Sequence, residues 1–237
     1  EFAVQTYRVA LAAFDAAQAE AQRKSRYLAA HIKPTQAEES EYPQRWTLLG
    51  LTGAAQAVDL QQALPERLSV VKAGNQQVVL LGQKLTPGKM APAFKVVDAN
   101  FSKVELADYS GKTVLISVVP SIDTGVCSLQ TKRFNEEVAK LPEDLVILTI
   151  STDLPFAQKR YCQQEQIDKM PVLSDAVWRD FGSNYGLLIK DMGLLTRSVL
   201  IIDSKGILVY QQLVDELAKE PDYADALAAL QQLLNKG

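Results

Sequence analysis

One cysteine of this chain stands where a thiolate could form and act as a nucleophile. Cys127 follows the apolar run Thr113–Val119 and precedes apolar residues at helical spacing, which predicts a buried strand, a loop and a helix with Cys127 in its first turn. The unpaired backbone N–H groups and the positive dipole end of such a turn stabilise a thiolate. Thr124 can direct its hydroxyl at the sulfur or at an oxygen bound beside it. The alternative is a small buried cysteine that only packs, and the spacing of Pro120, Thr124 and Cys127 weighs against it.

That spacing resembles the active-site pattern of the peroxiredoxins. The run Ser-Ile-Asp-Thr-Gly-Val-Cys at residues 121–127 is similar to their bacterial thiol peroxidase branch in particular. The resemblance covers about residues 70 to 235 and continues in further segments, in the order of the family's motifs. These segments are Ser151-Thr-Asp-Leu-Pro-Phe-Ala-Gln-Lys-Arg-Tyr-Cys162, Leu195-Thr-Arg-Ser-Val199, Gln212-Leu-Val-Asp-Glu216 and Glu220-Pro-Asp-Tyr223.

The resemblance implies a thioredoxin-dependent peroxidase that reduces hydrogen peroxide and organic hydroperoxides in antioxidant defence, without a metal or an organic cofactor. It identifies Cys127 as the peroxidatic cysteine, whose sulfenic acid condenses with the resolving thiol of Cys162. A thioredoxin-type reductant then opens the intramolecular disulfide. Arg197 corresponds to the family's active-site arginine and supplies a fixed positive charge, while Pro120 keeps water away from the sulfur and Thr124 bonds sulfur or peroxide. Members of the family often form homodimers.

Composition and motif content exclude several other classes of function. The net charge of −3 and the isoelectric point near 5.3 argue against a nucleic-acid surface, and no apolar run approaches the roughly 20 residues of a membrane span. Cys127 and Cys162 lie 35 positions apart without a C-x-x-C pattern, which excludes a local redox pair and a four-ligand zinc site. The single histidine, His31, lies far from Cys127 in the sequence and is expected to have no catalytic role. The glycine-rich motifs of nucleotide-binding loops are missing.

The first 57 residues are predicted to form a separate region. Residues 1 to about 32 are rich in alanine, glutamine and charge, with a coiled-coil seam, and they predict a long helical arm. Residues 1–50 resemble the C-terminal periplasmic helix of capsule-polysaccharide export proteins of the inner membrane, with Glu41-Tyr-Pro-Gln-Arg45 at the junction. We interpret residues 1–57 as a helical arm and linker of foreign origin, and residues 58–237 as the thiol peroxidase domain.

Residues 58–237 alternate strand and helix signals, which predicts an α/β, three-layer fold of thioredoxin-like type with an N-terminal β-hairpin. Gly74-Asn75 marks the turn of that hairpin. Asp153 is predicted to cap the helix that carries Cys162, and Pro221 to open the closing helix. Further strands are predicted at residues 145–150, 172–173, 198–202 and 207–211.

Two other classes of function remain open from the residues alone. One is a non-enzymatic thioredoxin-like domain with a permanent structural disulfide and a coiled-coil arm that binds a partner. For Arg197 alone, the alternative to an active-site role is a surface ion pair. The other is a dithiol oxidoreductase of thioredoxin type, which the missing C-x-x-C pattern disfavours. The signal-like Ala55-Gln-Ala57 favours the periplasm over the cytoplasm as the compartment.

Overall fold

The computed structural model describes residues 64–138, 142 and 145–235. The chain divides into two units, Glu1–Ala57 and Val58–Gly237, and the described residues all belong to the second. The predictions for the first 57 residues, which concern the helical arm, its single histidine and its foreign origin, therefore lie outside the described residues.

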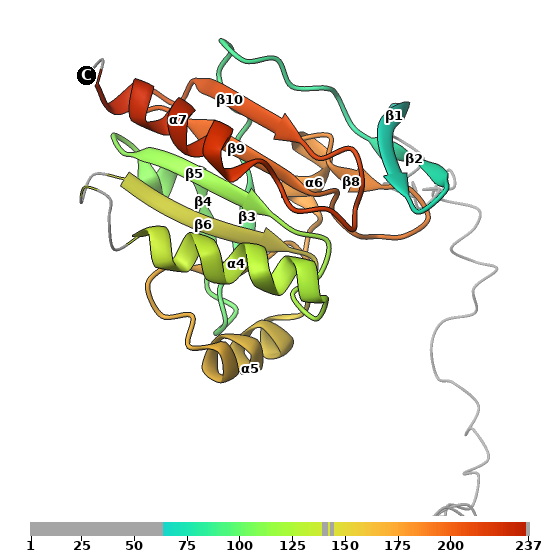
Figure 1. Ribbon diagram of the computed structural model, residues 1–237, viewed down its shortest axis with the longest axis horizontal. Helices are drawn as coiled ribbons and strands as arrows, with labels where there is room; N and C mark the ends of the chain where they lie inside the picture. Colours follow the sequence, from blue (N-terminus) through green and yellow to red (C-terminus); the bar gives the residue numbers. More distant parts are fainter. Residues whose placement is uncertain (1–63, 139–141, 143–144, 236–237) are drawn as a thin grey trace, which may run out of the picture. The chain divides into compact units, whose positions relative to one another are not determined.

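A mixed β-sheet forms the centre of the second unit (Figure 1). Its strands are β3 (Lys95–Val97), β4 (Lys103–Glu105), β5 (Thr113–Val118), β6 (Leu145–Ser151), β7 (Val172–Ser174), β9 (Ser198–Ile202) and β10 (Leu208–Leu213). Within the described residues these seven strands lie in the order β10-β9-β5-β6-β7-β3-β4. β5, β6 and β7 are parallel, whereas β9 is antiparallel to β5 and forms a hairpin with β10. The predicted α/β architecture with a late hairpin is confirmed.

The two helices that carry the cysteines form where the sequence predicts them. The helices of the described residues are η1 (Leu106–Tyr109), α4 (Gly125–Val138), α5 (Pro155–Glu165), α6 (Asp180–Asn184) and α7 (Tyr223–Leu234). Cys127 lies in the first turn of α4, and Cys162 lies within α5. Pro155 occupies the start of α5, where a missing N–H costs no helical hydrogen bond.

Two helix starts differ from the prediction. Asp153 does not cap α5, because Leu154 is the N-cap residue and the Asp153 carboxylate is bonded to a different loop. Pro221 does not open α7 either. The N-cap of α7 is Asp222, whose side chain accepts a hydrogen bond from the Asp225 N–H, so the proline lies just outside the helix.

Side chains of the central strand β5 alternate between two apolar cores. Val114 and Ile116 belong to the core that includes Phe181 of α6, whereas Leu115 belongs to the opposite core, which includes Phe134 of α4. α7 contributes to this second core as well, and α4 and α7 cover the same face of the sheet in Figure 1. Every residue of β5 is buried because both faces of the strand are covered, as its continuous apolar run predicts.

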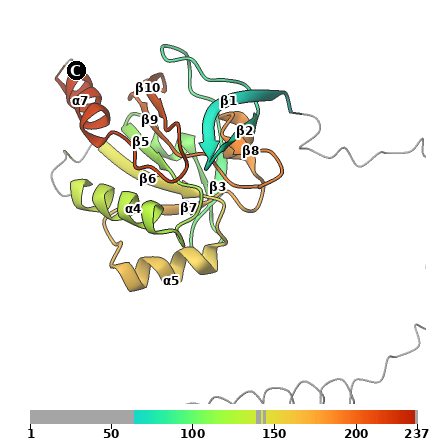
Figure 2. The same cartoon turned by 45° about the vertical axis from the view of Figure 1, so that its right-hand side comes forward.

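An N-terminal hairpin precedes the central sheet, as predicted. It consists of β1 (Glu66–Ala73) and β2 (Gln76–Leu81), which pair in the antiparallel direction. Gly74 in the turn has a φ of 63°, a conformation that glycine adopts without steric cost. β2 also pairs with the short strand β8 (Leu188–Ile189), and the three strands lie together in Figure 2.

The first strand of the hairpin also bonds to a distant segment of the chain. The Lys72 N–H donates to the Asp215 carbonyl at 2.8 Å, and the Leu217 N–H donates to the Lys72 carbonyl at 2.9 Å. Because these are backbone hydrogen bonds, they tie β1 to the loop that follows β10 regardless of the side chains involved.

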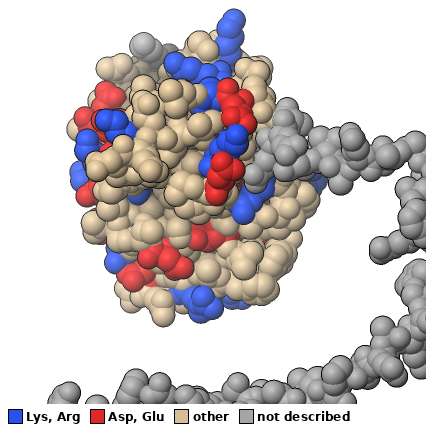
Figure 3. Space-filling model, turned by 90° about the vertical axis from the view of Figure 1, so that its right-hand side faces the viewer, with Lys and Arg blue, Asp and Glu red and all other residues tan. Residues whose placement is uncertain are grey.

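The surface of the described unit carries mixed charge on the face seen in Figure 3, where basic and acidic side chains are interspersed among other residues. That face shows no continuous basic area. Among the described residues, no helix combines the length and the apolar character needed to cross a bilayer.

Candidate active site

The Cys127 side chain is fully buried in the first turn of α4. Its exposed fraction is 0%, and it packs in the same apolar cluster as Val119 and Ile122. The first helical hydrogen bond of α4 runs from the Ser128 N–H to the Thr124 carbonyl at 2.9 Å. Cys127 therefore occupies the helix end at which free N–H groups and the dipole favour negative charge.

Arg197 brings a positive charge to this sulfur from a position 70 residues later in the chain. Its Nη2 donates to Cys127 Sγ at 3.1 Å. The side chain is 1% exposed, and its other donors reach Gln130 Oε1 at 2.7 Å and the Leu217 carbonyl at 2.8 and 3.3 Å. A guanidinium can be buried at a tolerable cost only when its donors are satisfied in this way. The arginine thus lies beside the thiol and not in a surface ion pair.

Gln130 orients this arginine and was not among the predicted site residues. Its side chain is 0% exposed, and its Nε2 donates to Ser117 Oγ of β5 at 2.8 Å while its Oε1 accepts from Arg197. One signal was available: Gln130 shares a helical face with Cys127 and Phe134, at spacings of three and four residues. A glutamine on a buried helix face requires polar partners inside the protein.

Thr124 and Pro120 lie in the loop before α4. The predicted hydrogen bond from Thr124 to the sulfur is not formed in this structure. The exposed Thr124 hydroxyl donates to the Ser121 carbonyl at 3.1 Å and so bonds the loop backbone instead of the sulfur. Pro120 is buried directly after β5. A Thr124 hydrogen bond to a bound peroxide stays a prediction, because it concerns a state in which the peroxide is present.

Cys162 occupies a different environment on the neighbouring helix. It is half-buried, and burial raises the pKa of its thiol, so at a given pH it carries less thiolate than an exposed cysteine. An open hollow of about 700 Å³ lies beside it, lined by Asn135, Cys162, Gln163, Gln166, Ile167, Asp168 and Lys169. Both cysteines are free thiols in this structure.

Residues next to the two cysteines hold α5 against α4. The Tyr161 hydroxyl contacts Ser128 twice, at 3.2 Å from its carbonyl and 3.1 Å from its Oγ, and Lys132 forms an ion pair with Glu165. α5 lies below α4 in Figures 1 and 2. The structure therefore places the two predicted cysteines on helices that contact each other, with no disulfide between them.

Comparison with known proteins assigns a family to this arrangement. The sequence model of the Redoxin family matches residues 86–227, more than half of the chain. A thiol peroxidase of Oceanobacillus iheyensis is 47% identical over 163 residues, which cover 69% of this chain and 99% of that protein. The chain belongs to the thiol peroxidase branch of the Redoxin family. A thiol peroxidase of Staphylococcus aureus is also 47% identical, over 154 residues that cover 65% of this chain and 93% of that protein.

Solved structures agree with the thiol peroxidase fold. A peroxiredoxin-like protein from Aquifex aeolicus has a TM-score of 0.66 at 36% identity, covering 70% of this chain and 99% of that chain. A thiol peroxidase from Chromobacterium violaceum has a TM-score of 0.63 at 21% identity, covering 70% and 98%, and shows the shared fold alone. These relatives give no support to the resemblance of residues 1–50 to capsule-polysaccharide export proteins.

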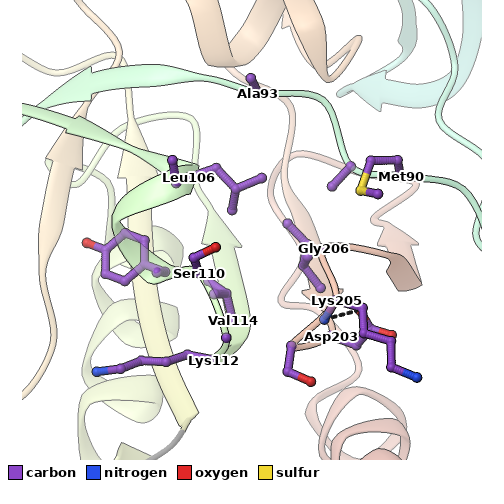
Figure 4. Close-up of a pocket in the computed structure, with 15 residues that line it drawn as sticks. Met90, Ala93, Leu106, Ser110, Lys112, Val114, Asp203, Lys205 and Gly206 are labelled. Carbon is purple, nitrogen blue, oxygen red and sulfur yellow. Dashed lines mark hydrogen bonds between the residues drawn. The ribbon is translucent and has the colours of Figure 1, made fainter.

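A second cavity lies away from this thiol peroxidase site. It has a volume of about 310 Å³ and lies between η1 and the turn that joins β9 to β10 (Figure 4). Its lining includes Met90, Leu106 and Lys205 but neither cysteine and not Arg197. Asp203 beside it is engaged by the backbone, because its carboxylate accepts from the Lys205 N–H at 3.0 Å. The cavity therefore offers no group from the thiol chemistry.

Proposed function

We propose that this chain reduces hydroperoxides with Cys127 as the attacking thiolate and Arg197 as the charge that stabilises it. The observation that carries the proposal is the 3.1 Å hydrogen bond from Arg197 Nη2 to Cys127 Sγ in the first turn of α4. The thiolate is the nucleophilic form of cysteine, and both a guanidinium donor and a helix N-terminus favour that form. Membership of the thiol peroxidase branch supports the same reaction.

In the first step the Cys127 thiolate attacks the terminal oxygen of the hydroperoxide. The S–O bond forms as the O–O bond breaks, and the second oxygen leaves with the electron pair and takes up a proton to become water or an alcohol. The sulfur loses two electrons and becomes a sulfenic acid. Arg197 can also donate to the oxygen on which negative charge develops, because its Nη2 already lies beside the sulfur.

The second step involves Cys162. Its sulfur attacks the sulfenic sulfur of Cys127, a disulfide forms, and the oxygen leaves as water. A thioredoxin-type dithiol then reduces the disulfide to two thiols and becomes a disulfide itself. Because the cysteines lie on separate helices and Cys127 is fully buried, the first turn of α4 and part of α5 have to open before the S–S bond can form.

Mass spectrometry after addition of one equivalent of hydroperoxide tests this cycle against a non-enzymatic domain with a permanent disulfide. We expect the untreated protein to have two free thiols, and the treated protein to contain a Cys127–Cys162 disulfide that thioredoxin removes. A disulfide that is present before peroxide is added, and that does not change afterwards, would favour the structural role. Reduction of insulin without peroxide would favour a thioredoxin-type oxidoreductase.

We also propose that residues 58–237 are the functional unit, that this unit forms a homodimer, and that it acts in the periplasm. Every residue assigned to chemistry lies between Pro120 and Arg197. Exposed apolar side chains favour association: Leu154 is 60% exposed, Phe156 is 62% exposed, and the ring of Phe156 packs on the 45% exposed Phe101. The helical arm proposed for residues 1–57 would alter oligomer size without altering the chemistry.

Deletion of residues 1–57 is expected to leave peroxidase turnover within about twofold of the full chain, because a domain with its own core keeps its site. Turnover with thioredoxin and mass by light scattering, measured on both proteins, check the two parts of this expectation. A folded truncation that has lost most of its turnover would show that the arm belongs to the functional unit, and a truncation of monomer mass would contradict the dimer.

A further inference from the structure

We propose that Asp153 is a positioning residue that holds the Cys127 loop against the segment leading to the Cys162 helix, and that it thereby controls the balance between peroxide attack and disulfide formation. The inference rests on the proposed function, because it takes Cys127 as the reacting thiol and Cys162 as its resolving partner. It assigns Asp153 a role that differs from the helix cap predicted from the sequence.

The Asp153 carboxylate accepts two hydrogen bonds from the loop that precedes α4. Ser121 Oγ donates to Oδ1 at 2.7 Å, and the Ile122 N–H donates to Oδ2 at 2.8 Å. The same loop contains the turn in which Thr124 donates to the Ser121 carbonyl, and it continues directly into Cys127. A displacement of the carboxylate therefore acts on the segment that fixes the start of α4.

Further contacts fix Asp153 to β6, β7 and α5, and we call the whole set of Asp153 contacts the Asp153 junction. Ser151 Oγ, at the end of β6, donates to Oδ2 at 2.6 Å and accepts from Gln158 Nε2 of α5 at 2.9 Å. Ser174 Oγ of β7 donates to the Asp153 carbonyl at 2.5 Å. Asp153 is thus anchored to β6, β7 and α5, while its carboxylate reaches across to the loop before α4.

The carboxylate accepts from all three donors to this side chain, and as a charged acceptor it strengthens each bond. An asparagine in the same place could accept from Ile122 and Ser151 at its Oδ1 and donate its NH₂ group to Ser121 Oγ, because a serine hydroxyl also accepts. All three hydrogen bonds would then be neutral. Hydrogen bonds to a charged group are stronger than neutral ones, so loss of the charge shifts a local opening equilibrium by about tenfold.

The two chemical steps require opposite states of the Asp153 junction, closed for peroxide attack and open for disulfide formation. Peroxide attack needs the start of α4 in place, because Cys127 meets Arg197 only there. Disulfide formation needs the same turn and part of α5 to open, because the cysteines lie on separate helices. A variant with weaker hydrogen bonds at the Asp153 junction is therefore expected to slow the peroxide step and to speed the disulfide step.

The test compares Asp153→Asn with Asp123→Asn in the full chain. Asp123 is exposed in the same loop, and its carboxylate has no hydrogen-bond or ion-pair partner within residues 64–138 and 145–235, so the control removes the same charge without removing a contact. Rapid quenching at varied hydrogen peroxide gives the peroxide step from its concentration dependence, and at saturating peroxide it gives the disulfide step. We expect Asp153→Asn to accelerate the disulfide step by up to about tenfold and to slow the peroxide step by a smaller factor, because the two changes share a single tenfold shift of the opening equilibrium. Asp123→Asn is expected to stay close to wild type.

Hydrogen exchange supplies a second readout, in which protection should fall in residues 121–128 of Asp153→Asn and persist in β5 and β9. If Asp153→Asn does not fold, Ser121→Ala removes one donor to the same carboxylate and should shift both rates in the same directions by a smaller factor. Rates that fall together, or rates equal to those of Asp123→Asn, would overturn the proposal. Failure of the proposed function is distinguishable, because then wild type itself would not reduce peroxide or Cys127→Ser would still do so.

Discussion

Replacement of Cys127 by serine is expected to lower peroxide turnover by at least roughly a thousandfold, to the level of a protein-free reaction, because an alcohol cannot replace the thiolate as nucleophile. Cys162→Ser is expected to behave differently. It should reduce one equivalent of peroxide at the wild-type rate and then stop, with a sulfenic acid on Cys127 that a sulfenate-specific reagent captures.

Stopped-flow measurement of peroxide consumption, followed by mass spectrometry of the quenched protein, distinguishes the two variants. The different environments of the thiols support this asymmetry, since Cys127 receives a hydrogen bond from Arg197 whereas burial raises the pKa of Cys162. Full cycling of Cys162→Ser with thioredoxin would replace the two-cysteine cycle by a single-cysteine mechanism. Single-event reduction by Cys127→Ser would reverse the roles of the two thiols.

Arg197→Met is expected to slow the peroxide step by about a hundredfold or more, the usual effect of losing a donor aimed at a developing negative charge. The matched control is Arg160→Met, which makes the same chemical change at an exposed position of α5 that has no hydrogen-bond or ion-pair partner among the described residues. The second-order rate constant with hydrogen peroxide, together with the ultraviolet absorbance of the thiolate, checks the expectation.

Loss of stability has to be separated from loss of chemistry in this variant. Removal of the guanidinium leaves Gln130 Oε1 and the Leu217 carbonyl without their donor, at a cost of about 1–3 kcal/mol each. Thermal unfolding measured beside the rate, and Arg197→Lys as a variant that keeps the charge, make the separation. If a folded Arg197→Met protein kept the wild-type rate and the wild-type thiolate absorbance, Arg197 would be reduced to a packing role.

The sequence predicted those parts of the site that depend on neighbouring residues. The continuous apolar run before Pro120 and the helical spacing after Cys127 are local patterns, and both describe the structure correctly. The hairpin around Gly74 is local in the same sense, since glycine marks its turn. By contrast, α6 and β8, with five and two residues, are too short to show a period.

Contacts between segments that are distant in the sequence could not be predicted from such local patterns. The Arg197–Cys127 hydrogen bond joins residues 70 positions apart, and it was expected only because the family motif includes an arginine at that place. Asp153 shows how a local rule can mislead. An aspartate just before a helix that begins with proline is a plausible cap, but Ser121 and Ile122, more than thirty residues earlier, provide donors that hold its carboxylate in the fold.

The backbone pairing between β1 and the loop after β10 has a consequence for how this protein tolerates variation. Arg197 is held by the Leu217 carbonyl, and the Leu217 N–H is held in turn by the carbonyl of Lys72. Most substitutions at position 72 are expected to keep that contact, because it is made by main-chain atoms. Proline is the exception, since it lacks the N–H that Asp215 accepts, and its effect would be felt at the buried arginine as well as in the hairpin.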